Sequence, residues 1–575
     1  MVRGTFFGVE IGKTGLTTAQ FGLDVTGHNI SNLDTDGFTR QRIVSTAHDP
    51  FSTVGRFAPV GQGLVGGGVR VQILDQIRSA YLDRRFREET STHAYWDTRA
   101  QSLSYIESFF DNVNEKTSIN HSMAEFFRSM TVVAQDPVAG APRTLMQTTA
   151  MDLVQQLNSI YQGLIDFQSV ENRAVITKTN DINRMAQDIS DLNVAIYTFE
   201  LTGMIANDLR DKRNLLLDEL SRYADIQYRE YPDQFGHSMM EVKLAGSILV
   251  DHDRINELSI AWEENVLGPD EPKVAIPFWK SWAPDNYNPD DPDNNELADE
   301  ILASARLDIF LKAGELKAHL DMRDGIEGGV DSTQRGIPYY IERINDLARA
   351  LVIEVNQVHA QGWSDHPDGS RTGILFFDNL GFGDVRVGEV RYYDAAGVRV
   401  MDPESEDIVR AEYFVDPDDP NIKLITAKNI MLSKDIQDNA FNIAASSAKI
   451  GLAGTGTPIE LQRHNNENMK KLYALFGRTN FTVQGRPIGS FDEFGTTIRF
   501  DVGNTLHTAK QAAETSRILT HAANNQRTAV AGVSLDEEMV GLVKYNHAYN
   551  GASRVITAMD DALDRLINGT GRVGL

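Results

Sequence analysis

The feature that most constrains this chain is a helical spacing of apolar residues that recurs along much of its length. The clearest run has an apolar side chain every three or four positions, at Ile182, Met185, Ile189, Leu192, Ile196 and Phe199. This spacing places the side chains on one face of an α-helix and is typical of coiled-coil packing. Similar stripes occupy residues 103–113, 123–133 and 341–358. The sequence therefore predicts long helices packed as a bundle.

Both ends of the chain carry thinner apolar stripes. The first consists of Val9, Leu16, Ala19, Leu23 and Ile30. After a helical stretch with Leu506, Ala509, Ala513 and Ile518 and a break at Gly532, the last consists of Leu535, Met539, Leu542, Tyr549, Ile556, Leu563 and Ile567. Polar residues interrupt this second stripe, and such interruptions cost stability but can fix register and partner choice.

Neither terminal stripe offers enough apolar surface to offset the conformational entropy of ordering its helix. We therefore expect both ends to be mobile in the isolated chain and to become ordered when neighbouring subunits supply the missing apolar surface. Pairing of the two ends would fold the chain back on itself and leave the middle segments to project outward.

The middle of the chain changes character. Residues 226–260 and 383–425 predict short strands separated by Asp, Gly and Pro turns, and Val69–Ile73 predicts another strand. Residues 262–300 are acidic and rich in Pro, Asn and Asp, which predicts an exposed loop system. The expected fold class is mainly α with β insertions: an elongated multidomain chain with a long-helix core, paired terminal helices and outward β-rich parts.

Charge and composition exclude several classes of function. A formal net charge of -26 disfavours binding to nucleic acid or to anionic lipid headgroups, because these carry the same sign. The chain has no cysteine, which excludes disulfides, thiolate nucleophiles and cysteine-based metal sites. No secretory signal is visible in residues 1–33, and no apolar run reaches membrane-spanning length.

Local patterns that could carry chemistry all have a simpler interpretation. Gly61–Gly66 matches the dinucleotide-binding glycine pattern but lacks the preceding strand and following helix, which favours a flexible turn. Asp290, Asp291 and Asp293 lack the Gly and Glu of a calcium loop. The histidines are scattered, with no pair at metal-binding spacing. We therefore expect no catalytic residue, no metal and no cofactor.

Two stretches near the N-terminus, Leu23–Asn32 and Thr35–Gln41, resemble the N-terminal signature of the flagellar axial protein family, which comprises rod, hook and hook-associated proteins. The family usually has Pro before Gly37 and Tyr after it, whereas Asp36 and Phe38 stand here. The turn is kept, but the rigid proline ring is lost.

Three further stretches narrow the resemblance. Asn207–Leu216 is similar to a motif that flagellins share with hook-associated proteins and that hook and rod subunits normally lack. Leu347–Gly362 resembles a middle helix of the hook-associated proteins, and Gly532–Met539 with Tyr545, Tyr549 and Ala552 resembles their C-terminal signature. The outward β-rich parts match no motif of the family.

The resemblance implies a structural subunit of the bacterial flagellum, at the junction between hook and filament. It implies export in the unfolded state by the flagellar type III apparatus without signal cleavage, and an extracellular location. The implied partners are copies of the chain in a ring, the hook protein, a second junction protein on the filament side, and an export chaperone at the C-terminal helical region. A hook or rod subunit is the alternative within the family, and an enzyme with a site in the β insertions is the alternative outside it.

The expected domain division follows from these segments. Residues 1–45 and 535–575 form a terminal coiled-coil assembly domain; residues 46–245, 315–362 and 437–534 form the helical core; and residues 246–314 and 363–436 form the outward β-rich part. No membrane insertion and no nucleic acid are expected.

Assembly contacts are expected at both ends of the chain. The residues are Leu23, Asn29, Ile30, Asn32, Gly37, Phe38, Leu535, Met539, Leu542, Tyr545, Tyr549, Ile556 and Leu563. Asn29 and Asn32 could instead only cap helix ends. The C-terminal apolar residues could instead form an ordinary core within one chain.

Overall fold

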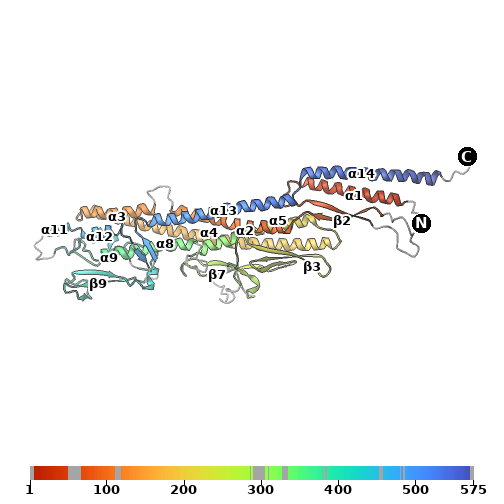
Figure 1. The fold of residues 1–575 in the computed structure, drawn as a ribbon. Helices are drawn as coiled ribbons and strands as arrows, with labels where there is room; N and C mark the ends of the chain where they lie inside the picture. The colour runs from red at the N-terminus through yellow and green to blue at the C-terminus, as the bar shows by residue number, and fades with distance from the viewer. Residues whose placement is uncertain are drawn as a thin grey trace.

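The computed structural model describes residues 6–48, 66–110, 118–284, 287–288, 305–308, 310–326, 335–378, 380–381, 385–451, 458–479, 481–483 and 486–569. The molecule is elongated, with a long helical body and two helices that project from one end (Figure 1). These two helices are α1 (Phe7–Ser31) and α14 (Leu535–Asp564), and they pack along each other. We call this pair the arm. The predicted elongated fold and the pairing of the terminal helices are confirmed.

The body is built on a bundle of long helices. Its backbone is α4 (Gly140–Glu200), whose 61 residues extend about 90 Å at 1.5 Å per residue. Beside it lie α2 (Ala80–Phe110), α3 (Ile119–Gln135), α5 (Asn207–Tyr223) and α13 (Phe494–Ala531). The tight spacing of apolar residues in 182–199 is thus part of one continuous helix.

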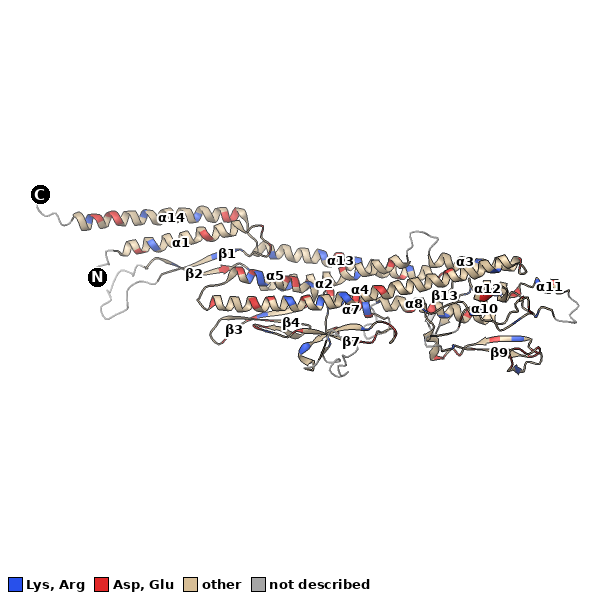
Figure 2. Ribbon diagram, turned by 180° about the vertical axis from the view of Figure 1, so that it is seen from behind, with Lys and Arg blue, Asp and Glu red and all other residues tan. Residues whose placement is uncertain are grey.

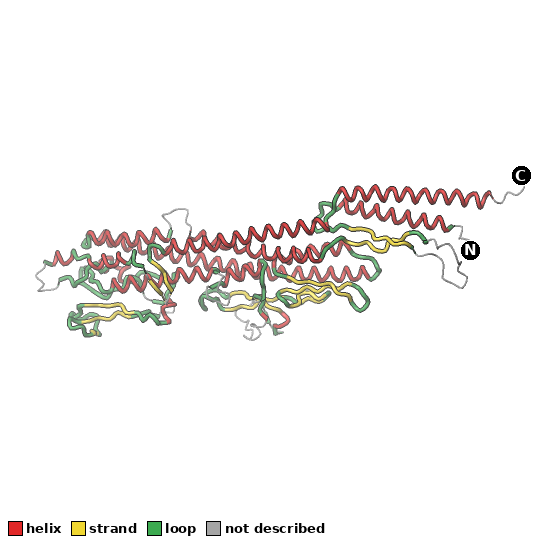
Figure 3. The backbone as a smooth tube through the Cα atoms, viewed as in Figure 1, coloured by secondary structure: helices red, strands yellow, loops and turns green. Residues whose placement is uncertain are grey.

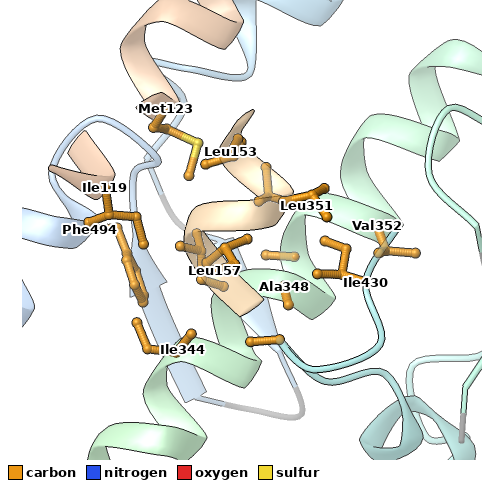
Figure 4. Packing of buried hydrophobic residues seen from close by; sticks show 14 of the residues in the cluster. Ile119, Met123, Leu153, Leu157, Ile344, Ala348, Leu351, Val352, Ile430 and Phe494 are labelled. Carbon is orange, nitrogen blue, oxygen red and sulfur yellow. The ribbon is translucent and has the colours of Figure 1, made fainter. Parts of the chain in front are cut away.

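The core of the body is apolar and lies where helices from distant parts of the chain meet. Leu153 and Leu157 of α4 are fully buried and approach Ala348 and Leu351 (Figure 4). The stripe predicted at 341–358 supplies these partners. It forms α8 (Ile337–Ala350), a π-helical turn η3 (Leu351–Val355) and α9 (Asn356–His359).

Two polar residues after this π-helical turn hold extended backbone against the bundle. The amide of Asn356 donates to the carbonyl of Phe377 at 2.9 Å and accepts from two backbone N–H groups, those of Phe376 and Phe377. His359 contacts the Ile374 carbonyl at 2.7 Å and the Ala444 N–H at 2.9 Å. The side chains thus satisfy backbone groups that no regular sheet pairs.

Small antiparallel sheets lie along one side of the body (Figure 3). The strands β3 (Ile226–Pro232), β4 (Ser238–Leu244), β5 (Ser247–Asp251) and β6 (Arg254–Ile255) form one sheet in that order. Farther along, β9 (Glu389–Tyr393) lies between β10 (Arg399–Val400) and β11 (Arg410–Phe414). The predicted strands in 226–260 and 383–425 are confirmed.

The prediction of an exposed loop system over 262–300 is wrong for part of that segment. Within it, β8 (Val274–Trp279) pairs with β7 (Leu258–Glu263), and every residue of β8 is buried. The apolar residues of β8 form a strand despite the acidic residues on either side of them, because they pair with β7 and are buried. Residues 285–286 and 289–300 of the predicted loop lie outside the described residues.

Two further hairpins complete the strands. The pair β1 (Gln41–Ala47) and β2 (Val69–Gln76) runs beside the arm, and β2 includes the predicted strand at Val69–Ile73. The pair β12 (Phe481–Val483) and β13 (Arg486–Gly489) precedes α13. The remaining short elements are η2 (Lys280–Trp282), α7 (Glu315–Asp324), η5 (Pro420–Leu424), α10 (Lys434–Asp438), η6 (Ala440–Asn442), α11 (Ile459–Arg463), α12 (Glu467–Ala474) and η7 (Arg565–Gly569).

Two residues predicted on buried stripes are exposed. Phe199 lies in the last turn of α4 and is 43% exposed, and Ile518 on α13 is 56% exposed. A three-to-four spacing identifies one face of a helix but not where the elements packed against that face end.

The glycine-rich turn at Gly61–Gly66 lies outside the described residues except for Gly66, as do Asp290, Asp291 and Asp293. Among the helices that the structure describes, none has the length and hydropathy to cross a membrane.

Candidate assembly joint

Three segments that are far apart in the sequence meet where the arm joins the body. They are the end of α1 with the turn into β1, the start of α5, and the break between α13 and α14 (Figure 1). The stretches that carry the family resemblance at 23–41, 207–216 and 532–539 are these same segments. We call this region the joint. Its contacts are mostly polar and buried.

Asn29, near the end of α1, is the buried centre of the joint. Its Nδ2 donates to the Gln41 carbonyl at 2.9 Å and to Glu538 Oε2 at 3.1 Å. Its Oδ1 accepts the Gln41 N–H at 3.1 Å. One amide side chain thus satisfies both backbone groups of the first residue of β1 and also reaches α14.

Glu538 ties α14 to the same point. It is the one buried residue among those described on α14, and its Oε1 accepts from Arg40 Nε at 2.7 Å. Arg40 also pairs with Glu537, and its backbone N–H donates to the Ala531 carbonyl at 2.9 Å. Burial lowers the pKa of Arg40, but the two carboxylates outweigh burial and raise it above its ordinary value. The guanidinium is therefore a permanent cation between the two carboxylates.

The start of α5 forms the body side of the joint. Gln41 Nε2 donates to Asp208 Oδ1 at 3.0 Å, and the Thr39 N–H donates to Asp211 Oδ2 at 3.0 Å. Asn207 Nδ2 returns a hydrogen bond to Gln41 Oε1 at 3.3 Å. Burial raises the pKa of Asp211, and the hydrogen bond from Thr39 offsets this only in part.

Two arginines extend the network from α2 and the segment before it. Arg78 donates to Asp83 at 2.6 and 3.1 Å and to Thr39 Oγ1 at 3.2 Å. Arg87, which is 2% exposed, donates to Asp218 at 2.7 Å. Figure 2 shows both acidic and basic positions on the helices of the body near the arm. The joint is therefore held by several ion pairs between arginine and carboxylate side chains.

The turn that leads from α1 into β1 needs its glycine. Gly37 has φ +76°, and a Cβ at this position would lie 3.4 Å from Leu215. Phe38 is half-buried and its ring meets His28 edge-on at 5.3 Å. Asn32 is the C-cap of α1, and its Nδ2 donates to the His28 carbonyl at 3.0 Å.

Inside the arm, α1 presents small residues to α14. A Cβ added to Gly8 would lie 2.5 Å from Met559, one added to Gly12 would lie 2.7 Å from Ile556, and one added to Gly22 would lie 2.5 Å from Tyr545. Ala19, between them on the same face, is buried. Large side chains of α14 thus dock directly against the backbone of α1. The partners run in opposite directions along the two helices, so the pair is antiparallel.

The residues predicted for assembly therefore have different surroundings. Asn29 is buried in the joint, while Leu23, Ile30, Asn32 and Phe38 are half-buried and Gly37 is exposed. On α14, the half-buried residues are Leu542, Tyr545, Tyr549, Ile556 and Leu563. Leu535 and Met539 remain 48% and 49% exposed. The larger apolar residues expected on α1, Val9, Leu16, Leu23 and Ile30, are half-buried.

The sequence interpretation missed the charged members of the joint. Arg40 and Glu538 are separated by 498 residues, and Gln41 and Asp208 by 167. No spacing rule links such residues. The available signal was the presence of charged side chains within stretches that resemble the family signatures, because charge is unusual where two helices pack.

The charged side chains of the joint pair with one another. The part of the chain that the structure describes contains no group of three or more His, Asp or Glu that could hold a metal ion. A cavity of about 90 Å³ lies beside Gly37, Arg78 and Asp218, and the charged side chains that line it are paired. These contacts hold the arm against the body.

Comparisons with known families match both the body and the arm. Residues 103–377 match the family described as "Flagellar hook-associated protein FlgK helical domain". Residues 525–569 match "Flagellar basal body rod FlgEFG protein C-terminal". The second match covers the end of α13 and all of α14.

Curated relatives extend over the whole chain. Flagellar hook-associated protein 1 of Bacillus subtilis is 26% identical over 572 residues, which cover 99% of both chains. The protein of the same name from Salmonella typhimurium is 24% identical and covers 96% of this chain and 98% of the relative. The solved structure of the flagellar hook junction protein FlgK from Burkholderia pseudomallei has a TM-score of 0.52 and 14% identity, over 79% of this chain and 100% of that one. This likeness shows a shared fold.

Proposed function

We propose that this chain, which is similar over 99% of its length to a flagellar hook-associated protein, is itself a structural subunit at the junction between hook and filament. Its part in the flagellum is mechanical. The long body and the arm made from both ends of the chain suit a subunit that is stacked with others along a common axis.

The observation that carries this proposal is the exposed apolar surface of the arm. On α14, Leu535, Met539 and Val543 lie four residues apart and are 48%, 49% and 51% exposed. Val540 is 70% exposed. In a chain that functions as a monomer, these apolar side chains would stay in water and contribute no burial free energy. Neighbouring subunits that cover them would gain roughly 25 cal/mol for each Å² removed from water.

The partners follow from this position. We propose that copies of the chain form a ring, that the hook protein lies on one side and a second junction protein on the other, and that an export chaperone binds the C-terminal helical region before assembly. The chain would reach the cell exterior through the flagellar export apparatus without cleavage of a signal peptide. The exposed apolar residues of α14 support the chaperone in particular, because they need cover before assembly.

The division of labour within the chain is also part of the proposal. Residues 1–45 and 535–575 serve assembly, residues 46–245, 315–362 and 437–534 form the core, and residues 246–314 and 363–436 face outward. The predicted contact residues at the two ends act in assembly, with Asn29 and Glu538 fixing the joint between them. We propose no catalytic activity.

A deletion and complementation experiment tests the proposal. Cells that lack the gene should make hooks without filaments and should not swim, and the intact gene should restore both. Electron microscopy of flagella that carry a tagged copy should locate the tag at the end of the hook. Swimming of the deletion strain would contradict the structural role. A tag found along the whole hook or in the rod would favour a hook or rod subunit instead.

A further inference from the structure

The arm meets the body at the joint and along the β1–β2 hairpin (Figure 3). The chain crosses from body to arm twice, through the turn after α1 and through Gly532–Ser534. Neither crossing is itself a helix or a strand. The direction in which the arm points therefore depends on contacts across the joint, because no helix or strand continues through either connection.

The contact that spans both crossings is made by Asn29, Arg40 and Glu538, and we call these three residues the latch. Asn29 belongs to α1, Arg40 to the turn that leads into β1, and Glu538 to the first turn of α14. The Glu538 carboxylate accepts from both of the others, at 3.1 and 2.7 Å. Arg40 in turn holds the end of α13 through the Ala531 carbonyl.

A partly broken latch should be unfavourable, because Glu538 is only 4% exposed. A buried carboxylate keeps its charge at low cost only while both hydrogen bonds are made, and a half-made arrangement leaves an uncompensated charge. The carboxylate is therefore either fully held or fully released into water. Intermediate arm directions are disfavoured, whereas an apolar contact would allow the helices to slide.

We infer that Glu538 is a positioning residue, which fixes the direction of the arm relative to the body and so presents the arm correctly to the assembly. The claim that Glu538 fixes the direction of the arm concerns the isolated chain. Only the claim that this direction matters for assembly rests on the proposed function. The neighbouring Glu537 pairs with the same Arg40 but has 62% of its side chain exposed, so it lacks the buried charge that makes the latch all-or-none.

The absence of cysteine allows a direct measurement on the full chain. Gln511→Cys on α13 and His547→Cys on α14 lie at exposed positions on either side of the Gly532 break and outside the latch. Spin labels at these two positions report the direction of the arm through pulsed electron–electron double resonance. In the parent, the molecules whose arm is folded should give a single narrow peak, and any molecules with an opened arm should add only a broad background.

The substitution Glu538→Gln keeps the size of the side chain and removes its charge. It should broaden the distance distribution, while the matched control Glu537→Gln leaves it narrow. The exchange Arg40→Glu with Glu538→Arg should be narrower than either of its single substitutions. An unchanged distribution in Glu538→Gln would overturn the inference. So would a loss of helix by circular dichroism in that variant, because the arm would then have unfolded instead of changing direction.

Complementation separates this inference from the proposed function. Cells with Glu538→Gln should carry fewer filaments than cells with Glu537→Gln. Normal filament numbers with a broadened distance distribution would overturn the link between arm direction and assembly and leave the junction role standing. Filaments on cells that lack the gene altogether would instead remove the junction role.

Discussion

Glycines on one face of α1 allow this helix to pack closely against α14. Gly8, Gly12 and Gly22 share the face of α1 that meets α14, and at each of them an added methyl group would lie within 2.7 Å of a side chain of α14. Glycine normally weakens a helix by about 1 kcal/mol relative to alanine. Its repeated use here therefore reflects the close approach of the α14 side chains to the α1 backbone, which a larger residue would prevent.

Two glycines of α1 offer a matched comparison. In Gly22→Ala the new methyl group would stand 2.5 Å from the Tyr545 ring, so overpacking should destabilise the arm by about 1–3 kcal/mol. In Gly27→Ala nothing lies within 4 Å, so the better helix former should stabilise α1 by about 0.5–1 kcal/mol. Hydrogen exchange over residues 7–31 measures both. Equal effects of the two substitutions would contradict the close packing.

A buried histidine makes the stability of the body depend on pH. Burial lowers the pKa of His359 to about 4. Its Nε2 accepts the Ala444 N–H, so a proton there would set two donors against each other. Below pH about 6.5 the unfolded chain takes up a proton that the folded chain does not.

Stability should therefore fall as the pH drops from about 6.5 to about 4, by roughly 3 kcal/mol from this group alone, and should not change on its account above pH 6.5. Urea unfolding at several pH values measures the slope. His359→Gln should lower stability at neutral pH and remove this part of the slope, whereas substitution of the exposed His547 should leave it in place. An unchanged slope in His359→Gln would show that other groups produce it.

At this scale the sequence identified apolar positions better than polar ones. The stripe at Ile182–Ile196 is buried largely as expected, because a three-to-four spacing depends only on neighbours within one helix. Glu538, Arg40 and His359 could not be assigned in this way. Their roles depend on partners that only the fold brings near, and a charged residue in a helix is most often solvated.

Among the elements, α5 connects the joint to the helices of the body through its acidic side chains. Its start holds the turn before β1, and Asp218 near its end accepts from Arg87 of α2 at 2.7 Å and from Arg527 of α13 at 2.5 Å. One carboxylate thus joins three helices. The flagellin-like motif at 207–216 predicted that this helix matters but not that its acidic residues are what connect the body.

Removal of that carboxylate should loosen the body. Asp218→Ala leaves Arg87 almost fully buried beside Asn214 with its main charge partner lost, which should lower the free energy of unfolding by about 3–5 kcal/mol. The control Glu514→Ala removes an exposed partner of Arg517 and should have little effect. Thermal unfolding compares the two variants. A small effect of Asp218→Ala would mean that water or Asn214 replaces the carboxylate.

Element boundaries show where sequence reasoning stops. The helices at both ends and the long bundle helices were predicted because their apolar periodicity extends over many turns. Strand β8 was predicted as loop because acidic and proline-rich neighbours dominate the composition of its surroundings. Six apolar or aromatic residues in a row can be strand, helix or loop, and only pairing with β7 decides among these.

The whole molecule combines a well-buried body with a thinly buried arm. The body has many residues with no exposed surface, whereas α14 has one buried residue among those described. The elongated shape and the paired ends were predictable from the stripes. The joint was not, because it depends on the meeting of three distant segments.

This contrast predicts a difference in local stability within the isolated chain. Amide hydrogens of α1 and α14 should exchange much faster than those of α4 between Leu153 and Ile196, because opening the arm exposes little apolar surface. Assembly with other subunits should slow exchange in the arm and leave α4 unchanged. Hydrogen exchange with mass spectrometry measures both states. Equal protection of arm and bundle in the isolated chain would contradict the expectation that the ends need neighbours.

The pairing of α1 with α14 has a consequence for biosynthesis. The ribosome synthesises α1 first, but its partner helix α14 is synthesised only after more than five hundred further residues. A product cut short ahead of Leu535 can form the bundle yet keeps a solitary first helix. The fold thus distinguishes finished chains from unfinished ones, because a truncated copy lacks the two-helix surface that we propose for assembly.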